Sequence, residues 1–274
     1  MSRAGLLMLV GASVACAGGA GAAPGRAALS PSAPVSYTAG RVTYYVAVHG
    51  RYEQEVGGQS QQVGSVLRYQ LTIVLEPAGL GFAARVVVDT VLQAQGQSLT
   101  DPEAAGRAAL TAVVSADGSV ADLSGADATG VLGQIVNGLR FIYPRLPAGG
   151  LIPGGEWVDT SSATVSGPAD LDVTTITQYR GGAWTEFAGR AAIAVVGTGT
   201  YDVIGAGEQA GQRFEITGIG VNRGTSYLGA DGRFLGAVST DTVYLDILLA
   251  GRGVTIPVRQ IQFDTVRAIM PDEQ

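Results

Sequence analysis

The feature that most constrains this chain is a period-two alternation of apolar and polar residues that persists over long stretches. Between residues 42 and 56 the even positions carry Val42, Tyr44, Val46 and Val48, while polar residues occupy the odd positions. The same alternation returns over residues 59–76 and 81–94. It indicates half-buried antiparallel strands. Strands of this length predict a large sheet that is twisted and curved.

Further strand patterns follow along the chain, separated by turn residues such as Asp231-Gly232. We expect about eleven or twelve strands in all. The fold class is therefore mainly β with a minor helical insertion. The remaining expected strands span 110–116, 119–123, 157–165, 171–180, 190–203, 213–223, 225–228, 234–249 and 254–269.

The alternation stops twice, and helical patterns replace it. Residues 100–103 read Thr-Asp-Pro-Glu, a typical helix start, which predicts a short helix over 101–109. Ser124 and Asp127 resemble a capping box ahead of a second helix over 125–143, which Pro144 would end. The second helix would present one apolar face at helical spacing, formed by Val131, Leu132, Ile135, Val136, Leu139, Ile142 and Tyr143.

The N-terminus reads as an export signal. Arg3 precedes a short apolar run and then small residues up to Cys16, so residues 1–16 predict a signal peptide. Because Cys16 follows Ser13-Val14-Ala15, the segment resembles a bacterial lipobox, in which the Cys is lipidated. Ordinary signal-peptidase cleavage, after residue 17 or residue 22, stays open as the alternative. Lipidation would tether the exported protein in the periplasm, at the outer membrane.

Residues 17–36 are almost entirely Ala, Gly, Pro and Ser, which predicts a flexible tether. Residues 37–270 then form a single β-rich domain. The chain has one Cys and one His, so thiol-rich or imidazole-rich metal sites and a disulfide framework are excluded. A net charge of −6 argues against nucleic-acid binding, and we expect no metal and no cofactor.

An exported chain of long antiparallel strands interrupted by amphipathic helices resembles the bacterial lipoprotein-carrier group of LolA, LolB and LppX. The segments 143–147 and 153–157 also resemble an element of envelope lipoproteins of unknown function. The resemblance covers most of the mature chain as an order of elements, without a specific motif. It implies a curved, half-open barrel closed by one or two amphipathic helices, with acyl chains held between sheet and helix.

Two hypotheses of function follow. The first is a hydrophobic ligand, an acyl chain or lipid, bound between the curved sheet and the helix. The alternative is a non-enzymatic scaffold or protein-interaction lipoprotein with a solid core, an exposed apolar patch or an open edge strand. The residues expected to line a ligand cavity are Leu67, Leu71, Ile73, Val131, Ile135, Leu139 and Ile142.

Catalysis is the least supported class. His49 is the only imidazole and lies on a polar strand face, and the chain lacks Lys. The carboxylate pairs Glu53/Glu55 and Asp170/Asp172 each lie on one strand face, as they do on many solvated sheets. Two acids also fall short of the six to eight oxygens that calcium needs. A membrane-spanning β-barrel is disfavoured by an aromatic content of 7%.

Overall fold

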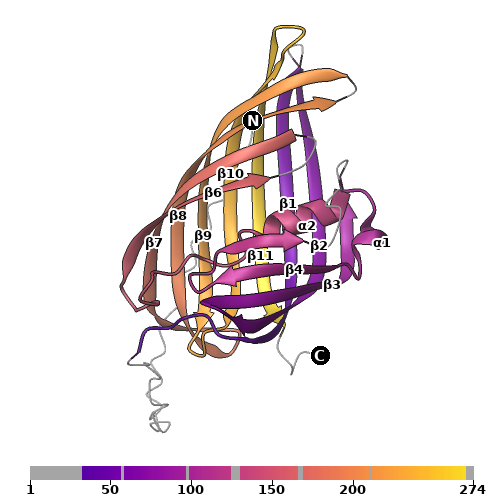
Figure 1. Cartoon of the computed structure of the whole chain (residues 1–274). Helices are drawn as coiled ribbons and strands as arrows, with labels where there is room; N and C mark the ends of the chain where they lie inside the picture. Colours follow the sequence, from indigo (N-terminus) through magenta and orange to yellow (C-terminus); the bar gives the residue numbers. More distant parts are fainter. Residues whose placement is uncertain are drawn as a thin grey trace, which may run out of the picture.

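The computed structural model describes residues 33–56, 59–96, 99–124, 130–165, 169–209 and 211–269. Within these ranges the chain forms eleven strands and two short helices (Figure 1). The helices are α1 (Pro102–Ala105) and α2 (Gly130–Leu139). The strands are β1 (Gly40–Val56), β2 (Gln59–Ala78), β3 (Gly81–Gln95), β4 (Ala109–Ser115), β5 (Val120–Ser124), β6 (Glu156–Val165), β7 (Ala169–Phe187), β8 (Arg190–Gln209), β9 (Gln212–Gly229), β10 (Phe234–Leu249) and β11 (Val254–Ile269).

All eleven strands belong to one antiparallel sheet with the order β5-β4-β3-β2-β1-β11-β10-β9-β8-β7-β6. Each half of the chain is a meander in which every strand pairs with the next. The two halves join where β1 pairs with β11, from Thr43 opposite Ile269 to Gln54 opposite Val258. The sheet curls around the helices without closing, so β5 and β6 remain its two margins (Figure 1). This confirms the predicted half-open barrel.

The core fills one end of the curl. The alternation predicted from the sequence places Leu67, Leu71 and Ile73 of β2 on the face that packs against α2, at 3%, 0% and 3% exposure. Two buried tyrosines tie distant segments into this core. Tyr37 donates to the carbonyl of Pro144 at 2.7 Å, and Tyr44 donates to the carbonyl of Phe234 at 3.0 Å.

Both helices are shorter than the sequence predicted. The helix expected over 101–109 ends at Ala105, because Gly106 is extended and Arg107 has a φ of 73°. The helix expected over 125–143 begins at Gly130 and ends at Leu139, while residues 125–129 lie outside the described ranges. The capping box is wrong at Ser124, which ends β5 and hydrogen-bonds Thr111 at 2.9 Å between the two hydroxyls. No helix in the described ranges is long and apolar enough to span a membrane.

Three strands are clearly longer than predicted. β8, expected to end at residue 203, continues to Gln209 because its pairing with β9 runs on to Gln212. β7 continues past Arg180 to Phe187 through a register shift against β8 between Gly181 and Trp184. The segments 213–223 and 225–228 are one strand, β9, because Gly224 stays paired with Ser239. The signal sequence, Cys16 and most of the tether fall within residues 1–32, outside the described ranges. Val35, which the sequence placed in the tether, is instead buried and pairs with Leu151.

Candidate functional site

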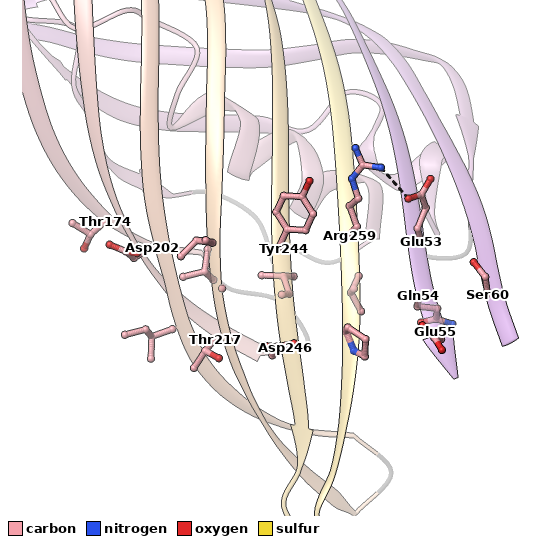
Figure 2. Close-up of a pocket in the computed structure, with 17 residues that line it drawn as sticks. Glu53, Gln54, Glu55, Ser60, Thr174, Asp202, Thr217, Tyr244, Asp246 and Arg259 are labelled. Carbon is pink, nitrogen blue, oxygen red and sulfur yellow. Dashed lines mark hydrogen bonds and ion pairs between the residues drawn. The ribbon is translucent and has the colours of Figure 1, made fainter. Parts of the chain in front are cut away.

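A groove of about 1000 Å³ lies on the face of the sheet turned away from α2 (Figure 2). The register shows why it lies on that face. Five residues that are paired across five neighbouring strands form one row on the core side of the sheet. Side chains alternate between the two faces of a strand, so the residues just before and just after each member of this row face the groove. That row is Gln54, Val258, Leu245, Gly218 and Val203. The lining residues with side chains on the groove face are Glu53, Glu55, Ser60, Thr174, Asp202, Ile204, Thr217, Ile219, Tyr244, Asp246, Pro257 and Arg259.

The floor of the groove is apolar. Ile204, Ile219 and Tyr244 are 63%, 64% and 52% exposed, and Pro257 lies beside them on β11. Exposed aliphatic and aromatic side chains gathered in one hollow are a common property of binding surfaces. Tyr244 also lies next to a cation, since the guanidinium carbon of Arg259 is 5.8 Å from its ring centre.

At one end of the groove two arginines form ion pairs with a single glutamate. Arg259 donates to Glu53 at 3.2 Å, and Arg51 lies 3.0 Å from the same carboxylate (Figure 2 shows the Arg259 contact). The hydrogen bond to Glu53 raises the pKa of Arg259. Among the described residues that line the groove, Arg259 is the only cation. Because Arg259 is already paired with Glu53, it leaves the acids further along the groove without a neutralising partner.

The other acids of the groove are in excess. Among the described lining residues there are four acids, Glu53, Glu55, Asp202 and Asp246, and a single basic residue, Arg259. No cation of the described residues lies within ion-pair distance of Asp202 or Asp246. The arrangement therefore suits a ligand with both apolar and positively charged groups.

The residues predicted to line a lipid cavity lie together, but in the packed core. All of them are between 0% and 8% exposed, and they belong to one buried cluster. The hollow that touches Ile73 has a volume of about 10 Å³, which holds no more than a water molecule. The residues concerned are Leu67, Leu71, Ile73, Val131, Ile135, Leu139 and Ile142.

The side chains considered as catalytic candidates lie at different places on the sheet. Glu53 and Glu55 enter the groove, where Arg51 and Arg259 hold Glu53. His49 is paired with Phe263 in the β1–β11 ladder. Its neighbour Val48 faces the core, so the His49 side chain lies on the opposite face of the sheet. Asp172 accepts a hydrogen bond from Thr164 at 2.8 Å. The described ranges hold no group of three or more His, Cys, Asp or Glu side chains placed to bind a metal ion.

A second polar cluster lies inside the curl. Burial raises the pKa of Asp241 to about 7, and the neighbouring carboxylate of Asp264 contributes to the shift. Burial also raises the pKa of Asp264, which accepts hydrogen bonds from Gln262 at 3.0 Å and from Ser239 at 3.5 Å. Tyr201 lies close enough for Asp241 to raise its pKa further. The cluster could not be predicted from the sequence, because its members come from three strands.

Gly220 lies opposite Tyr201 in the β8–β9 ladder. Because Gly220 has no side chain, the ring of Tyr201 packs directly over its backbone. A Cβ at position 220 would overlap the tyrosine ring. We therefore expect Gly220→Val to lower the free energy of unfolding by about 1–3 kcal/mol, as overpacking does elsewhere. Urea denaturation measures this. Gly64→Val is the control, because the nearest atom to its new Cβ is 3.9 Å away. Equal losses for the two variants would contradict the packing.

Comparison with known proteins places the chain in no family. No family model matches it, and no curated protein matches it. Among solved structures, Neisserial surface protein A aligns with a TM-score of 0.21 and 8% identity, over 84% of this chain and 99% of that one. A TM-score this low does not establish a shared fold. Of the resemblance to the lipoprotein-carrier group, only the curled antiparallel half-barrel is therefore supported.

Proposed function

We propose that this chain is an exported, non-enzymatic envelope protein that binds a basic, extended segment of a partner protein in the outer groove. The observation that carries the proposal is the apolar floor of a groove of about 1000 Å³, bordered by four carboxylates and one ion-paired arginine. Export rests on the signal pattern of residues 1–16, and tethering at the outer membrane on lipidation of Cys16.

The dimensions of the groove agree with an extended peptide. A segment that crosses from β8 to β1 passes over five strands, a path of roughly 20 Å at the usual strand spacing. About six extended residues cover that distance. Apolar side chains of the segment would contact Ile219 and Tyr244, while its cations would approach Asp202 and Asp246.

Storage of an acyl chain between sheet and helix has less support. Ligand pockets usually have volumes of about 300–1000 Å³. The hollow on the core side of Ile73 is far smaller, and the large groove lies on the opposite face. Native mass spectrometry of the exported protein tests this alternative. A stoichiometric acyl species that co-purifies would favour the carrier and count against the groove as the functional site.

Removing two groove charges is expected to weaken binding of a basic peptide. The probe is an octapeptide of alternating Lys and Leu, compared with its Glu and Leu counterpart. For Asp202→Asn with Asp246→Asn we expect about tenfold weaker binding of the Lys peptide at low salt, because each exposed pair contributes up to ~1 kcal/mol. Isothermal titration calorimetry measures the affinity.

The matched control removes two exposed acids away from the groove, Glu76→Gln with Glu103→Gln. This variant keeps the same net charge as the groove variant and should bind like the unmodified chain. Equal weakening in both variants would mean that net charge alone attracts the peptide. Binding that is insensitive to both, or equal binding of the Glu peptide, would overturn the proposed function.

A further inference from the structure

The two margins of the half-barrel differ in how well they could accept another strand. β5 has five residues and pairs with β4 at three positions, with a register shift between Thr111 and Val113. Asp122 within it has a φ of 50°. Short edges with bulges and irregular backbone discourage pairing with other chains. The β5 margin is therefore protected.

The β6 margin has none of this protection. Its ten residues pair with β7 without interruption, from Glu156 opposite Arg180 to Val165 opposite Leu171. No backbone hydrogen bond in the described ranges joins β6 to any segment other than β7. β6 contains neither Pro nor a basic residue, which edges commonly use against pairing. A regular row of backbone N–H and C=O groups thus stays available.

The charges of β6 are satisfied within the chain. Asp159 lies 3.9 Å from Arg145, which also contacts Asp117 at 3.1 Å, and Glu156 lies 3.6 Å from Arg180. An added strand therefore needs no cation opposite Asp159. The most suitable partner is a neutral strand of Ser, Thr, Ala and Val, and residues 160–165 of β6 have this composition themselves.

We propose that β6 is a homodimer interface, at which the β6 strands of two copies pair antiparallel about a two-fold axis at Ser161. This register sets Trp157 opposite Val165, Val158 opposite Thr164 and Asp159 opposite Ala163 of the second copy. Aromatic and β-branched pairs of this kind stabilise sheets. Neither charged residue faces a like charge, and the interface is isologous, as a two-fold dimer requires. The proposal is independent of the groove, which lies across other strands.

A single thiol on the axis tests the register. We would express the full-length chain with Cys16→Ser and Ser161→Cys, and oxidise it at several protein concentrations. Directly opposite Cα atoms in an antiparallel pair lie about 4.5–5.5 Å apart, within disulfide range. Ser161→Cys should therefore give a cross-linked dimer. Ser162→Cys should not, because its two copies would be displaced along the strands. Equal cross-linking of both variants, or none, would overturn the proposed register.

A charge exchange tests the interface without cross-linking. Thr160 and Ser162 are both exposed and would lie opposite each other across the axis. Thr160→Lys with Ser162→Lys places like charges opposite each other across the axis. The dissociation constant of the dimer, measured by sedimentation equilibrium, should therefore rise at least about tenfold. Thr160→Lys with Ser162→Glu sets opposite charges together and should restore dimerisation.

Both charge variants alter the same exposed positions, so a difference between them reports pairing rather than folding. A chain that sediments as a monomer at every concentration overturns the proposal and leaves the β6 margin to a strand of another protein. The groove variant Asp202→Asn with Asp246→Asn should dimerise like the unmodified chain. Loss of peptide binding with intact dimerisation would therefore affect only the groove proposal.

Discussion

Ile135→Asp is expected to lower the free energy of unfolding by at least ~4 kcal/mol and to leave the chain largely unfolded. Ile135 is 0% exposed on α2 and belongs to the cluster that joins the helix to the sheet. A carboxylate at this position would be buried among apolar side chains without a partner, which is among the most destabilising of single substitutions. Circular dichroism during urea denaturation measures the loss.

Gln134→Asp is the matched control, since Gln134 is exposed one residue earlier on the same helix. It introduces the same side chain and should cost less than about 1 kcal/mol. A small cost for Ile135→Asp as well would mean that α2 covers a space that water can enter. That result would contradict the packed core and favour a lid over a ligand cavity.

The second large effect concerns pH. Burial raises the pKa of Asp241 to about 7, whereas an aspartate in an unfolded chain titrates near 3.9. Between these values the folded state binds the additional proton, so the free energy of unfolding falls as pH rises from about 4 to about 7. The contribution is fully lost above about pH 7. The two pKa values set an upper bound of ~4 kcal/mol on the change.

Asp241→Asn keeps the shape of the side chain and removes its titration. We expect this variant to be more stable than the unmodified chain at pH 8, by as much as ~4 kcal/mol, and to lose most of the advantage at pH 4. Thermal unfolding across this pH range gives the measurement. Glu103→Gln, at an exposed position, should leave the pH profile unchanged. A profile for Asp241→Asn parallel to that of the unmodified chain would show that Asp241 titrates normally.

The strands could be predicted because their alternation is a local property. Val42, Tyr44 and Val46 already mark one face of β1, and the structure buries the last two. Errors arose where local signals and tertiary contacts disagree. Gly181 and Gly182 read as the end of a strand, yet β7 continues beyond them, because its pairing with β8 resumes at Trp184. Ser124 read as a helix cap, although pairing with Thr111 holds it in β5.

The groove could not be predicted, because its residues are distant in the sequence. Glu53 and Arg259 are separated by 206 positions and meet only through the pairing of β1 with β11. Tyr244, Ile219 and Asp202 each look like an ordinary outward residue of a strand. Only the strand order brings them into one row, and that order does not follow from periodicity. The residues predicted to line a lipid cavity do lie together, because apolar faces of strands and helices pack against each other in any core.

The pairing of β1 with β11 also determines when the sheet can be completed. Each meander contains only pairings between strands that are neighbours in the chain, so each can form early and by itself. The joint between them lies in the middle of the sheet and needs β1 and β11, the first and the last strand along the chain, at the same time. Because β11 is synthesised after the other ten strands, the two halves remain separate sheets with exposed edges until it emerges. Completion of the half-barrel therefore waits for the last strand of the sheet.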